Sequence, residues 1–321
     1  MSPLPPGLSR REVLRRLSSA ALALAGVGTG AVAFSERRLA AAPAPAVRDW
    51  RARPEAPGAP SVVARGPDPA DNVRRALLSL GGMARFVRPG ETVLLKPNVG
   101  WDRLPEQGAN TDPRVVAELV RQARAAGARR VLVADLSCND PQRCFARSGV
   151  RAAAEAAGAS VLDGSALELV DAALPGVAWG LLVMKPLLEA DRVINLPVVK
   201  HHGLSRATLG MKNWMGVFGG GRNRLHQDID RSLAELCALF RPTLTVVDAT
   251  RVLMRNGPQG GSLADVKAVE AVAIGLDPVA CESWGAVQRG LDPRALGFIA
   301  AAEKAGLGTA EAGRVKELGP T

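Results

Sequence analysis

Two stretches decide the fold, Thr92-Val93-Leu94-Leu95-Lys96 and Val131-Leu132-Val133-Ala134-Asp135. Each is a short, continuous apolar run, which is typical of a strand that is buried on both faces. Between them, Asp112 and Pro113 supply a helix start, and apolar residues recur at helical spacing until Gly127. Two strands joined through a helix are expected to lie parallel in one sheet.

The same alternation continues outward from Ser61. Further strands are predicted at residues 160–163, 181–184, 192–197, 244–248 and 269–274, and further helices from Asp68 and at 152–157, 228–240, 278–288 and 293–304. This pattern predicts an α/β fold in which helices cover both faces of a mostly parallel sheet. Between Pro197 and Gln227 lies a long stretch that fits neither element. Such irregular segments in compact domains are usually functional or disordered, and its apolar residues favour function.

The composition of the 321-residue chain suits a globular protein, because 47% of its residues are hydrophobic and 22% are charged. Its four cysteines form no C-x-x-C pair, which argues against a disulfide scaffold, a zinc ribbon and an iron–sulfur cluster motif. The net charge of +10 does not indicate a nucleic-acid partner. Basic residues are scattered among acidic ones, and only 3% of residues are aromatic and able to stack on bases.

The N-terminus shows the order of an export signal. Arg10 and Arg11 precede an uncharged apolar run over residues 17–34, and small residues follow up to Ala46. This order resembles a twin-arginine (Tat) signal peptide with cleavage before Val47. We therefore expect the segment to engage the Tat translocase and the protein to be exported to the periplasm or the extracytoplasmic face. The alternative is an uncleaved signal that anchors the chain in the membrane, since the apolar run approaches bilayer length.

These signals divide the chain into three parts. Residues 1–46 are predicted to be the signal peptide, and their six Arg and two Glu account for +4 of the net charge. Residues 47–60, rich in Pro and Ala, are predicted to be an extended linker. Residues 61–321 are predicted to form a single α/β domain.

Polar residues follow several predicted strands, and ligands of open α/β sheets bind beyond the carboxyl ends of strands. Converging Lys and Arg side chains with oriented Asn amides predict an anionic small molecule, such as a carboxylate or phosphate, as ligand. Backbone N–H groups of a glycine run can also bind an anion. The candidate ligand-binding residues are Lys96, Asn98, Asn213, Gly219, Gly220, Gly221 and Arg222, and the candidate catalytic residues are His202, Lys200 and Lys212.

All three histidines fall between residues 201 and 226. His201 and His202 are adjacent and point apart on any regular element, and we expect His202 to face the site. As a catalyst, His202 would transfer a proton while the lysines hold and polarise the anion. The alternative role of these histidines is hydrogen bonding within a loop.

A divalent metal, Zn or Fe, is a further hypothesis for the same region. The mixed nitrogen and oxygen ligands would be His202, His226, Asp135 and Asp248. The neighbouring lysines argue against it, because they would repel a cation.

Cys138 and Cys144 lie in a loop after the strand that ends at Asp135. Their spacing leaves a disulfide, two free thiols or cofactor ligation open. Cys237 and Cys281 lie on apolar helical faces and are predicted to be core residues.

Several ordered motifs resemble one family. They are Lys96-Pro97-Asn98, Asn195-x-Pro197-x-x-Lys200-x-His202, Thr208-x-x-x-Lys212-Asn213-x-x-Gly216, Asp248-Ala249 and Asn256-Gly257-Pro258. Together they resemble the domain of unknown function family 362 (DUF362) over about Ser61 to Arg289. Members of that family often carry Tat signals or ferredoxin-like cluster domains. This chain lacks the cluster motif, so the resemblance implies the fold and the site but no iron–sulfur chemistry, and the reaction of the family is not settled.

The sequence therefore predicts an exported enzyme that acts on or with an anionic small molecule, with a metal or organic cofactor as an open question. The alternative is a non-catalytic binding protein of the cell envelope for an anionic ligand. No nucleic-acid partner is expected, and membrane contact is expected only through an uncleaved signal.

Overall fold

The computed structural model describes residues 46–51, 59–165, 167–174 and 181–319. The predicted signal peptide lies outside these residues, apart from Ala46, and so do residues 52–58, which are half of the predicted linker. Among the described residues, no helix is both long enough and apolar enough to cross a membrane.

The strands in chain order are β1 (Ser61–Arg65), β2 (Thr92–Pro97), β3 (Arg130–Ala134), β4 (Ser160–Leu162), β5 (Leu169–Asp171), β6 (Leu181–Met184), β7 (Arg192–Leu196), β8 (Val198–His202), β9 (Arg206–Thr208), β10 (Phe218–Gly220), β11 (Leu244–Leu253), β12 (Val266–Gly275) and β13 (Val315–Glu317). The α-helices are α2 (Pro69–Ser79), α3 (Pro113–Ala125), α4 (Pro141–Arg147), α5 (Val150–Ala156), α6 (Lys185–Glu189), α7 (Gly210–Asn213), α8 (Ile229–Leu239), α9 (Pro278–Gln288) and α10 (Gly297–Lys304). The helix starts predicted at Asp68 and Asp112 are confirmed, since each caps the helix that follows, and Asp277 caps α9 in the same way.

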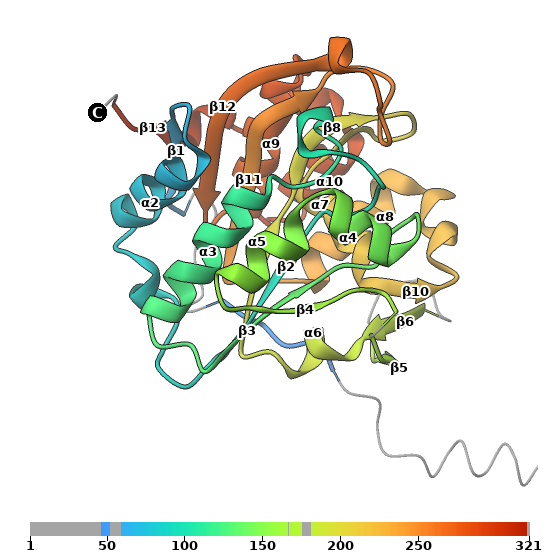
Figure 1. Cartoon of the computed structure of the whole chain (residues 1–321). Helices are drawn as coiled ribbons and strands as arrows, with labels where there is room; N and C mark the ends of the chain where they lie inside the picture. Colours follow the sequence, from blue (N-terminus) through green and yellow to red (C-terminus); the bar gives the residue numbers. More distant parts are fainter. Residues whose placement is uncertain (1–45, 52–58, 166, 175–180, 320–321) are drawn as a thin grey trace, which may run out of the picture. The chain divides into compact units, whose positions relative to one another are not determined.

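One mixed sheet runs through the molecule in the order β13-β1-β12-β11-β7-β2-β3-β4 (Figure 1). The central pairs β11/β7, β7/β2, β2/β3 and β3/β4 are parallel, whereas β12 is antiparallel to both of its neighbours. β8 continues from β7 after Pro197 and also pairs with β11, and β9 folds back on β8. A separate three-stranded antiparallel sheet has the order β10-β6-β5.

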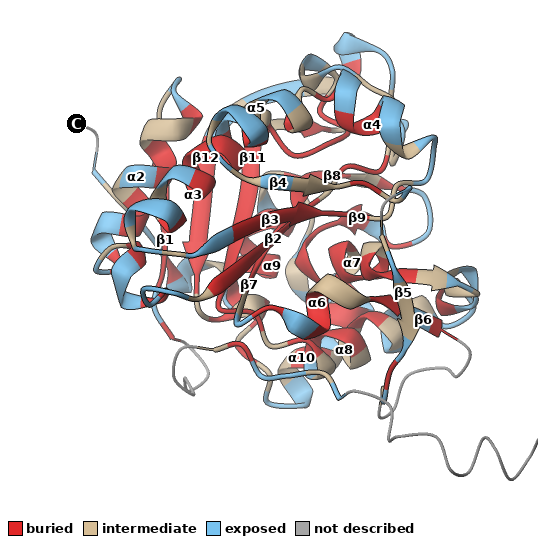
Figure 2. Ribbon diagram, turned by 60° about the horizontal axis from the view of Figure 1, so that its bottom comes forward, coloured by how far each residue is buried: buried red, intermediate tan, exposed pale blue. Residues whose placement is uncertain are grey.

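The strands of the main sheet bury side chains on both faces. Val93 and Leu95 pack into a cluster with α2, α3 and α5, whereas Leu94 points the other way into a cluster with α8, α9 and α10. Figure 2 shows the buried strands between the two helical layers. The predicted α/β class with helices on both faces of a mostly parallel sheet is confirmed. The strands are continuous apolar runs because both of their faces are buried.

The chain order of the sheet reverses beside β2. β3 and β4 extend the sheet on one side of β2, whereas β7 and then β11 lie on the other side. Such a switch point opens a crevice at the carboxyl ends of the adjoining strands, which here are the ends of β2 and β7.

The segment between Pro197 and Gln227 is more regular than its sequence indicates. It contains β8, β9, α7 and β10, and 3-10 turns at Trp214–Val217 and Arg222–His226. These elements have three to five residues each. A periodic pattern needs a longer window, so tertiary contacts rather than local sequence determine them.

The described start of the predicted linker is fastened to the domain. Trp50 is buried, and its ring stacks on Phe240 with the centroids 6.2 Å apart. The indole N–H donates to the Ala190 carbonyl, and the Thr243 hydroxyl donates to the Trp50 carbonyl. Residues 46–51 are therefore part of the folded unit, because an aromatic anchor interrupts the Pro/Ala-rich composition.

Candidate functional site

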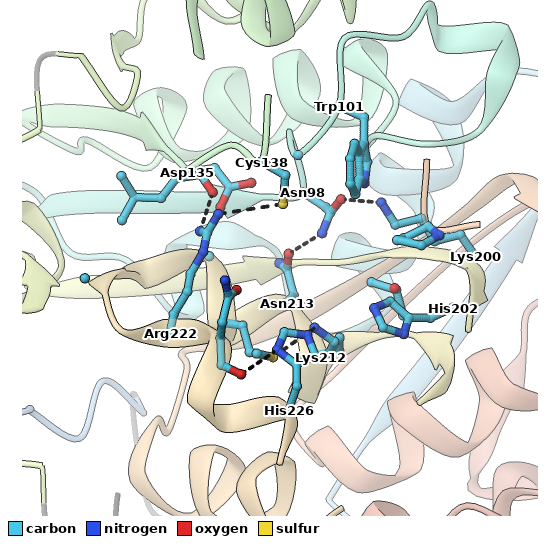
Figure 3. Close-up of a pocket in the computed structure, with 18 residues that line it drawn as sticks. Asn98, Trp101, Asp135, Cys138, Lys200, His202, Lys212, Asn213, Arg222 and His226 are labelled. Carbon is cyan, nitrogen blue, oxygen red and sulfur yellow. Dashed lines mark hydrogen bonds between the residues drawn. The ribbon is translucent and has the colours of Figure 1, made fainter. Parts of the chain in front are cut away.

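A cavity of about 420 Å³ lies beyond the end of β2 and along β8, beside the segment that carries the histidines (Figure 3). It is lined by nine of the residues singled out from the sequence: Asn98, Asp135, Lys200, His202, Lys212, Asn213, Gly220, Arg222 and His226. Lys96, Gly219, Gly221 and Asp248 do not line it. The structure thus brings most of the candidate residues to one place and gives the others different surroundings.

Lys96 lies beneath the cavity wall as part of a buried ion pair. Its Nζ is 2.7 Å from Asp135 Oδ1, and it also donates to the Pro97 carbonyl (2.9 Å) and to Asn213 Oδ1 (3.0 Å). These three acceptors use the three hydrogens of a lysine ammonium. Burial lowers the pKa of Lys96, and the Asp135 carboxylate opposes that shift. Lys96 therefore supports the site from below and does not contact a ligand in the cavity.

Two amides connect Lys96 with Lys200, and we call Lys96, Asn213, Asn98 and Lys200 the polar row. Asn213 Oδ1 accepts from Lys96 Nζ and from Asn98 Nδ2, both at 3.0 Å, and Asn98 Oδ1 accepts from Lys200 Nζ at 2.8 Å. The Lys96 ammonium can only donate, so Oδ1 of Asn213 must face it. That oxygen requires the Nδ2 of Asn98 on its other side, which leaves Asn98 Oδ1 to face Lys200. Asn213 Nδ2 then faces acceptors, the Lys96 carbonyl and Asn195 Oδ1.

Lys200 is as deeply buried as Lys96 but has no carboxylate partner. Its Nζ donates to Asn98 Oδ1 and to the Ala109 carbonyl, which are both neutral. Burial lowers the pKa of Lys200 to about 7, and Lys212 and Lys96 lower it further while Cys138 and Asp135 oppose the shift. At neutral pH, Lys200 is therefore a cavity-lining amine that holds its proton only part of the time.

Lys212 and His226 form a second basic pair at the cavity. Lys212 Nζ is 3.2 Å from His226 Nε2, and His226 Nδ1 is 3.3 Å from the Asn223 carbonyl. The carbonyl requires a proton on Nδ1, so Nε2 accepts from the lysine. Burial lowers the pKa of Lys212 to about 8 and, together with the Lys212 charge, lowers the pKa of His226.

His202 faces the cavity as a neutral imidazole. Its Nδ1 accepts the backbone N–H groups of Leu204 and Ser205, both at 3.2 Å, so its proton is on Nε2. Burial and then the Lys212 charge lower the pKa of His202 to about 3. This imidazole can donate a hydrogen bond through Nε2–H, but it does not take up a proton near neutral pH. His201 is turned away from the cavity toward Gly257, whose N–H donates to His201 Nδ1 at 3.1 Å.

The four residues of the metal hypothesis do not form a metal centre. Asp248 lies elsewhere and accepts the backbone N–H groups of Asp112 and Thr250, while Asp135 is bound by Lys96. A histidine that ligates a metal donates its other ring N–H to an acceptor, but the other nitrogen of His202 faces two N–H donors. In the described part of the chain, no group of three or more His, Cys, Asp or Glu side chains has metal-binding geometry.

The three glycines have separate surroundings. Gly219 and Gly220 lie in β10 and pair with Leu182 and Leu181 of β6. A Cβ at Gly219 would meet the end of the Leu169 side chain, which would have to shift to make room. Only Gly220, with φ +64°, lines the cavity. The expectation that the run forms a cradle of successive N–H groups does not hold, because a β ladder uses part of it.

Arg222 brings a guanidinium group to the cavity wall. Its guanidinium donates to the carbonyls of Leu136 (2.8 Å) and Ser137 (3.1 Å), and Cys138 Sγ lies 3.7 Å from Nη2. Cys138 is exposed and lines the cavity, and Cys144 is buried. Both are free thiols, so of the alternatives left open by their spacing the structure shows no disulfide.

The family described as "Domain of unknown function (DUF362)" matches residues 93–287 of this chain. The chain belongs to this family. The matched range falls within the Ser61 to Arg289 span expected from the motifs.

This DUF362 protein is also 30% identical over 252 residues to the thylakoid-associated protein sll1697 of Synechocystis sp. (strain ATCC 27184 / PCC 6803 / Kazusa), a match that covers 74% of each chain. Among solved structures, it is similar to the lactate racemase apoprotein from Thermoanaerobacterium thermosaccharolyticum, at 16% identity and a TM-score of 0.41, over 70% of this chain and 55% of that one. A protein from Thermotoga maritima has 12% identity and a TM-score of 0.33, over 75% of this chain and 59% of that one. The DUF362 chain thus spans less than two thirds of either solved structure.

Several residues of the DUF362 cavity were missed at the sequence level. Trp101 and Met215 line it, and so does Thr208, which the sequence marked only as part of a motif. Cys138 also lines it, although the sequence left a disulfide, a free thiol or cofactor ligation open for it and did not place it in the site. Thr208 is opposite Lys200 in the β8/β9 ladder, and its Oγ1 is buried with no hydrogen-bond partner among the described residues. A buried hydroxyl without a partner at a cavity wall is a feature that a ligand would satisfy.

Glu282 of α9 holds the helix that supplies two cavity residues. Its carboxylate accepts the Met211 backbone N–H at the start of α7, with distances of 3.0 and 3.2 Å to its two oxygens. Burial raises the pKa of Glu282 to about 8, and the backbone N–H groups oppose that shift. No local pattern indicates this role, because Glu282 and Met211 are far apart in the sequence.

Proposed function

We propose that this cavity is the active site of an enzyme that binds an anionic small molecule, a carboxylate or a phosphate, and transfers a proton through Lys200. The observation that carries the proposal is the charge of the cavity. Lys200, Lys212 and Arg222 line it, and the one carboxylate among the described lining residues, Asp135, is neutralised by Lys96 beneath it. An anion is the ligand that such a cavity attracts.

Lys212 and Arg222 are suited to hold the anion. The Arg222 guanidinium is held at the wall by two backbone carbonyls. The Lys212 ammonium lies on a short helix that Glu282 fastens from behind. Charges fixed in this way stabilise an anion without the cost of ordering flexible side chains.

Lys200 takes the proton-transfer role that the sequence assigned to His202. A general acid or base works best when its pKa is near the operating pH, which describes Lys200 at about 7 and excludes His202 at about 3. His202 instead presents Nε2–H as a fixed donor, suited to an oxygen of the substrate.

The test is to measure the binding of sulfate and of acetate to the purified protein by thermal shift and by calorimetry. We expect stabilisation by both anions, and a loss of at least about tenfold in affinity in Lys212→Met and Arg222→Ala. Lys267→Met, at an exposed position outside the cavity, is the matched control. Equal binding by all variants would refute the anion site. Binding without turnover of any small carboxylic or phosphoric acid would favour the non-catalytic binding protein.

We propose further that the protein is exported through the Tat translocase. Arg10, Arg11 and the apolar run support this, and the relative in Synechocystis is itself described as thylakoid-associated. The test is fractionation of cells that express the full chain or its Arg10→Lys/Arg11→Lys variant. Export of the parent chain alone, with Val47 as the mature N-terminus, is the expected result. Cytoplasmic retention of both chains would contradict it.

A further inference from the structure

We propose, building on the anion site above, that Lys200 forms an imine with the carbonyl group of a small 2-oxo acid. The substrate class follows from combining a nucleophilic amine with a carboxylate-binding wall in one cavity. A 2-oxo acid carries its electrophilic carbon directly beside its carboxylate.

The contacts of Lys200 Nζ match a neutral amine. A neutral amine has two N–H groups and one lone pair, whereas an ammonium has three N–H groups. Lys200 has two acceptors among the described residues, Asn98 Oδ1 and the Ala109 carbonyl. Lys96, by comparison, has three acceptors, one of which is a carboxylate. The two acceptors of Lys200 suffice for both N–H groups of a neutral amine, and the third position on Nζ, which would carry the lone pair, has no protein partner among the described residues, in a side chain that lines the cavity.

Hydrogen-bond donors surround this amine. His202 is two residues further along β8, and so is on the same side of the strand as Lys200. Its Nε2–H is available because Nδ1 is the accepting nitrogen. The Thr208 hydroxyl, paired with Lys200 across the ladder, has no partner among the described residues. Both groups can donate to the carbonyl oxygen as negative charge develops on it.

The reaction balances without an oxidant or reductant. The Nζ lone pair attacks the carbonyl carbon, and the carbonyl oxygen takes a proton from the Lys212 ammonium, whose pKa of about 8 permits that transfer. Nζ then loses a proton back to Lys212, which gives a carbinolamine. The Lys212 ammonium then protonates the hydroxyl group, which leaves as water while the C=N bond forms and gives an iminium. The iminium nitrogen returns a proton to Lys212, which gives the neutral imine. In total, one oxo acid is bound covalently and one water molecule is released.

Reductive trapping tests the imine. The purified protein is incubated with pyruvate and sodium cyanoborohydride, which delivers hydride to the imine carbon and leaves a stable secondary amine. Peptide mass mapping should find one pyruvate, less one oxygen atom, on Lys200, at least about tenfold faster than on exposed Lys267. Lys96 in the same digest is the internal control for a buried lysine and should stay unmodified. Sulfate should slow the labelling, and Lys200→Met should abolish it.

The outcomes separate this inference from the proposed function. In one outcome, pyruvate binds and gives a thermal shift that Arg222→Ala weakens, but Lys200 carries no label between pH 6 and pH 9. That result would overturn the imine and leave the anion site supported. Absence of binding by pyruvate, sulfate and acetate would overturn both. Labelling of Lys200 no faster than that of Lys267 would also overturn the imine, because it would show no special reactivity at the cavity.

Discussion

The two buried lysines at the strand ends, Lys96 and Lys200, have almost the same exposure and opposite surroundings. Lys96 Nζ has three acceptors including the Asp135 carboxylate, and Lys200 Nζ has two neutral acceptors. The first arrangement stabilises an ammonium, and the second stabilises an amine. Burial of a lysine therefore does not reveal its role, whereas the number and charge of its acceptors do. We assign Lys96 to the framework and Lys200 to the chemistry.

Replacement of each lysine by Met should separate these roles most strongly. Lys96→Met leaves the buried Asp135 carboxylate without its cation and should reduce the free energy of unfolding by about 3–5 kcal/mol. Lys200→Met removes an amine that has no ionic partner and should cost about 1 kcal/mol. Urea unfolding of both variants measures the difference. Equal losses would show that the two lysines have the same role.

The double variant Lys96→Met/Asp135→Leu distinguishes loss of a charge partner from loss of packing. It removes both charges and should recover part of the stability lost in Lys96→Met. A double variant that is less stable than Lys96→Met alone would mean that Asp135 acts chiefly through the Val99 N–H, which its Oδ2 also accepts.

The pH dependence of stability should identify the group with the depressed pKa. Above pH 7 the folded protein loses the Lys200 proton, whereas the unfolded chain keeps it up to a pKa of about 10.4. The unfolded state then binds more protons, so stability relative to Lys200→Met should rise by up to about 1.4 kcal/mol per pH unit between these values. Urea unfolding of the two proteins from pH 6 to pH 10 measures it. A constant difference would contradict the depressed pKa.

Anion affinity should respond to pH in the opposite sense. Lys200 and Lys212 lose their protons as the pH rises through about 7 and about 8. Sulfate, which stays fully ionised, should bind about tenfold more weakly at pH 9 than at pH 6. Calorimetry measures the affinity, and the change should be smaller in Lys212→Met. An affinity that increases with pH would rule out these lysines as the anion-binding groups.

The reactivity of the cysteine thiols tests access to the cavity that Lys200 lines. Cys138 is exposed at the cavity, whereas Cys144, Cys237 and Cys281 are buried, and burial raises the pKa of the last two to about 12. One thiol per native chain should therefore react rapidly with a disulfide reagent. Sulfate should slow that reaction about twofold or more by occupying the cavity. Reaction of two or more thiols at the same rate would contradict the burial of the others.

The smallest expected effect concerns His202, which shares β8 with Lys200. Its ring should remain neutral with the proton on Nε2 from pH 5 to pH 8, because Nδ1 accepts two backbone N–H groups. Nitrogen-15 spectra of the three histidines show the tautomer directly. A titration of His202 near pH 6.5 would return it to the role of proton acceptor that the sequence indicated.

Much of the fold was predictable because its central elements have strong local signals. Continuous apolar runs identified β2, β3 and β6 to within a residue, and an Asp-Pro start with helical spacing identified α3. β8, β9 and α7 gave no usable signal, since elements of three to five residues depend on contacts with distant strands. β11 also extends beyond the predicted end at Asp248, because its second half pairs with β12 and β8.

The candidate site was predictable as a location but not as a set of roles. Residues that follow strands do meet at the cavity, since parallel strands end at one edge of a sheet. Which lysine is paired could not be predicted, because Lys96 and Asp135 are on different strands and nothing in either sequence neighbourhood indicates the contact. Thr208 was missed for a related reason, since its significance is the absence of a partner in three dimensions.

The polar row has a practical consequence for ligand discovery. Each of its two amides faces a donor on one side and an acceptor on the other, so flipping either would place like groups against each other. The polar row therefore has a single low-energy arrangement and cannot rearrange to fit different ligands. A crystal soaked with a library of small acids should accordingly show fragments that share one orientation, with their carboxylates superimposed.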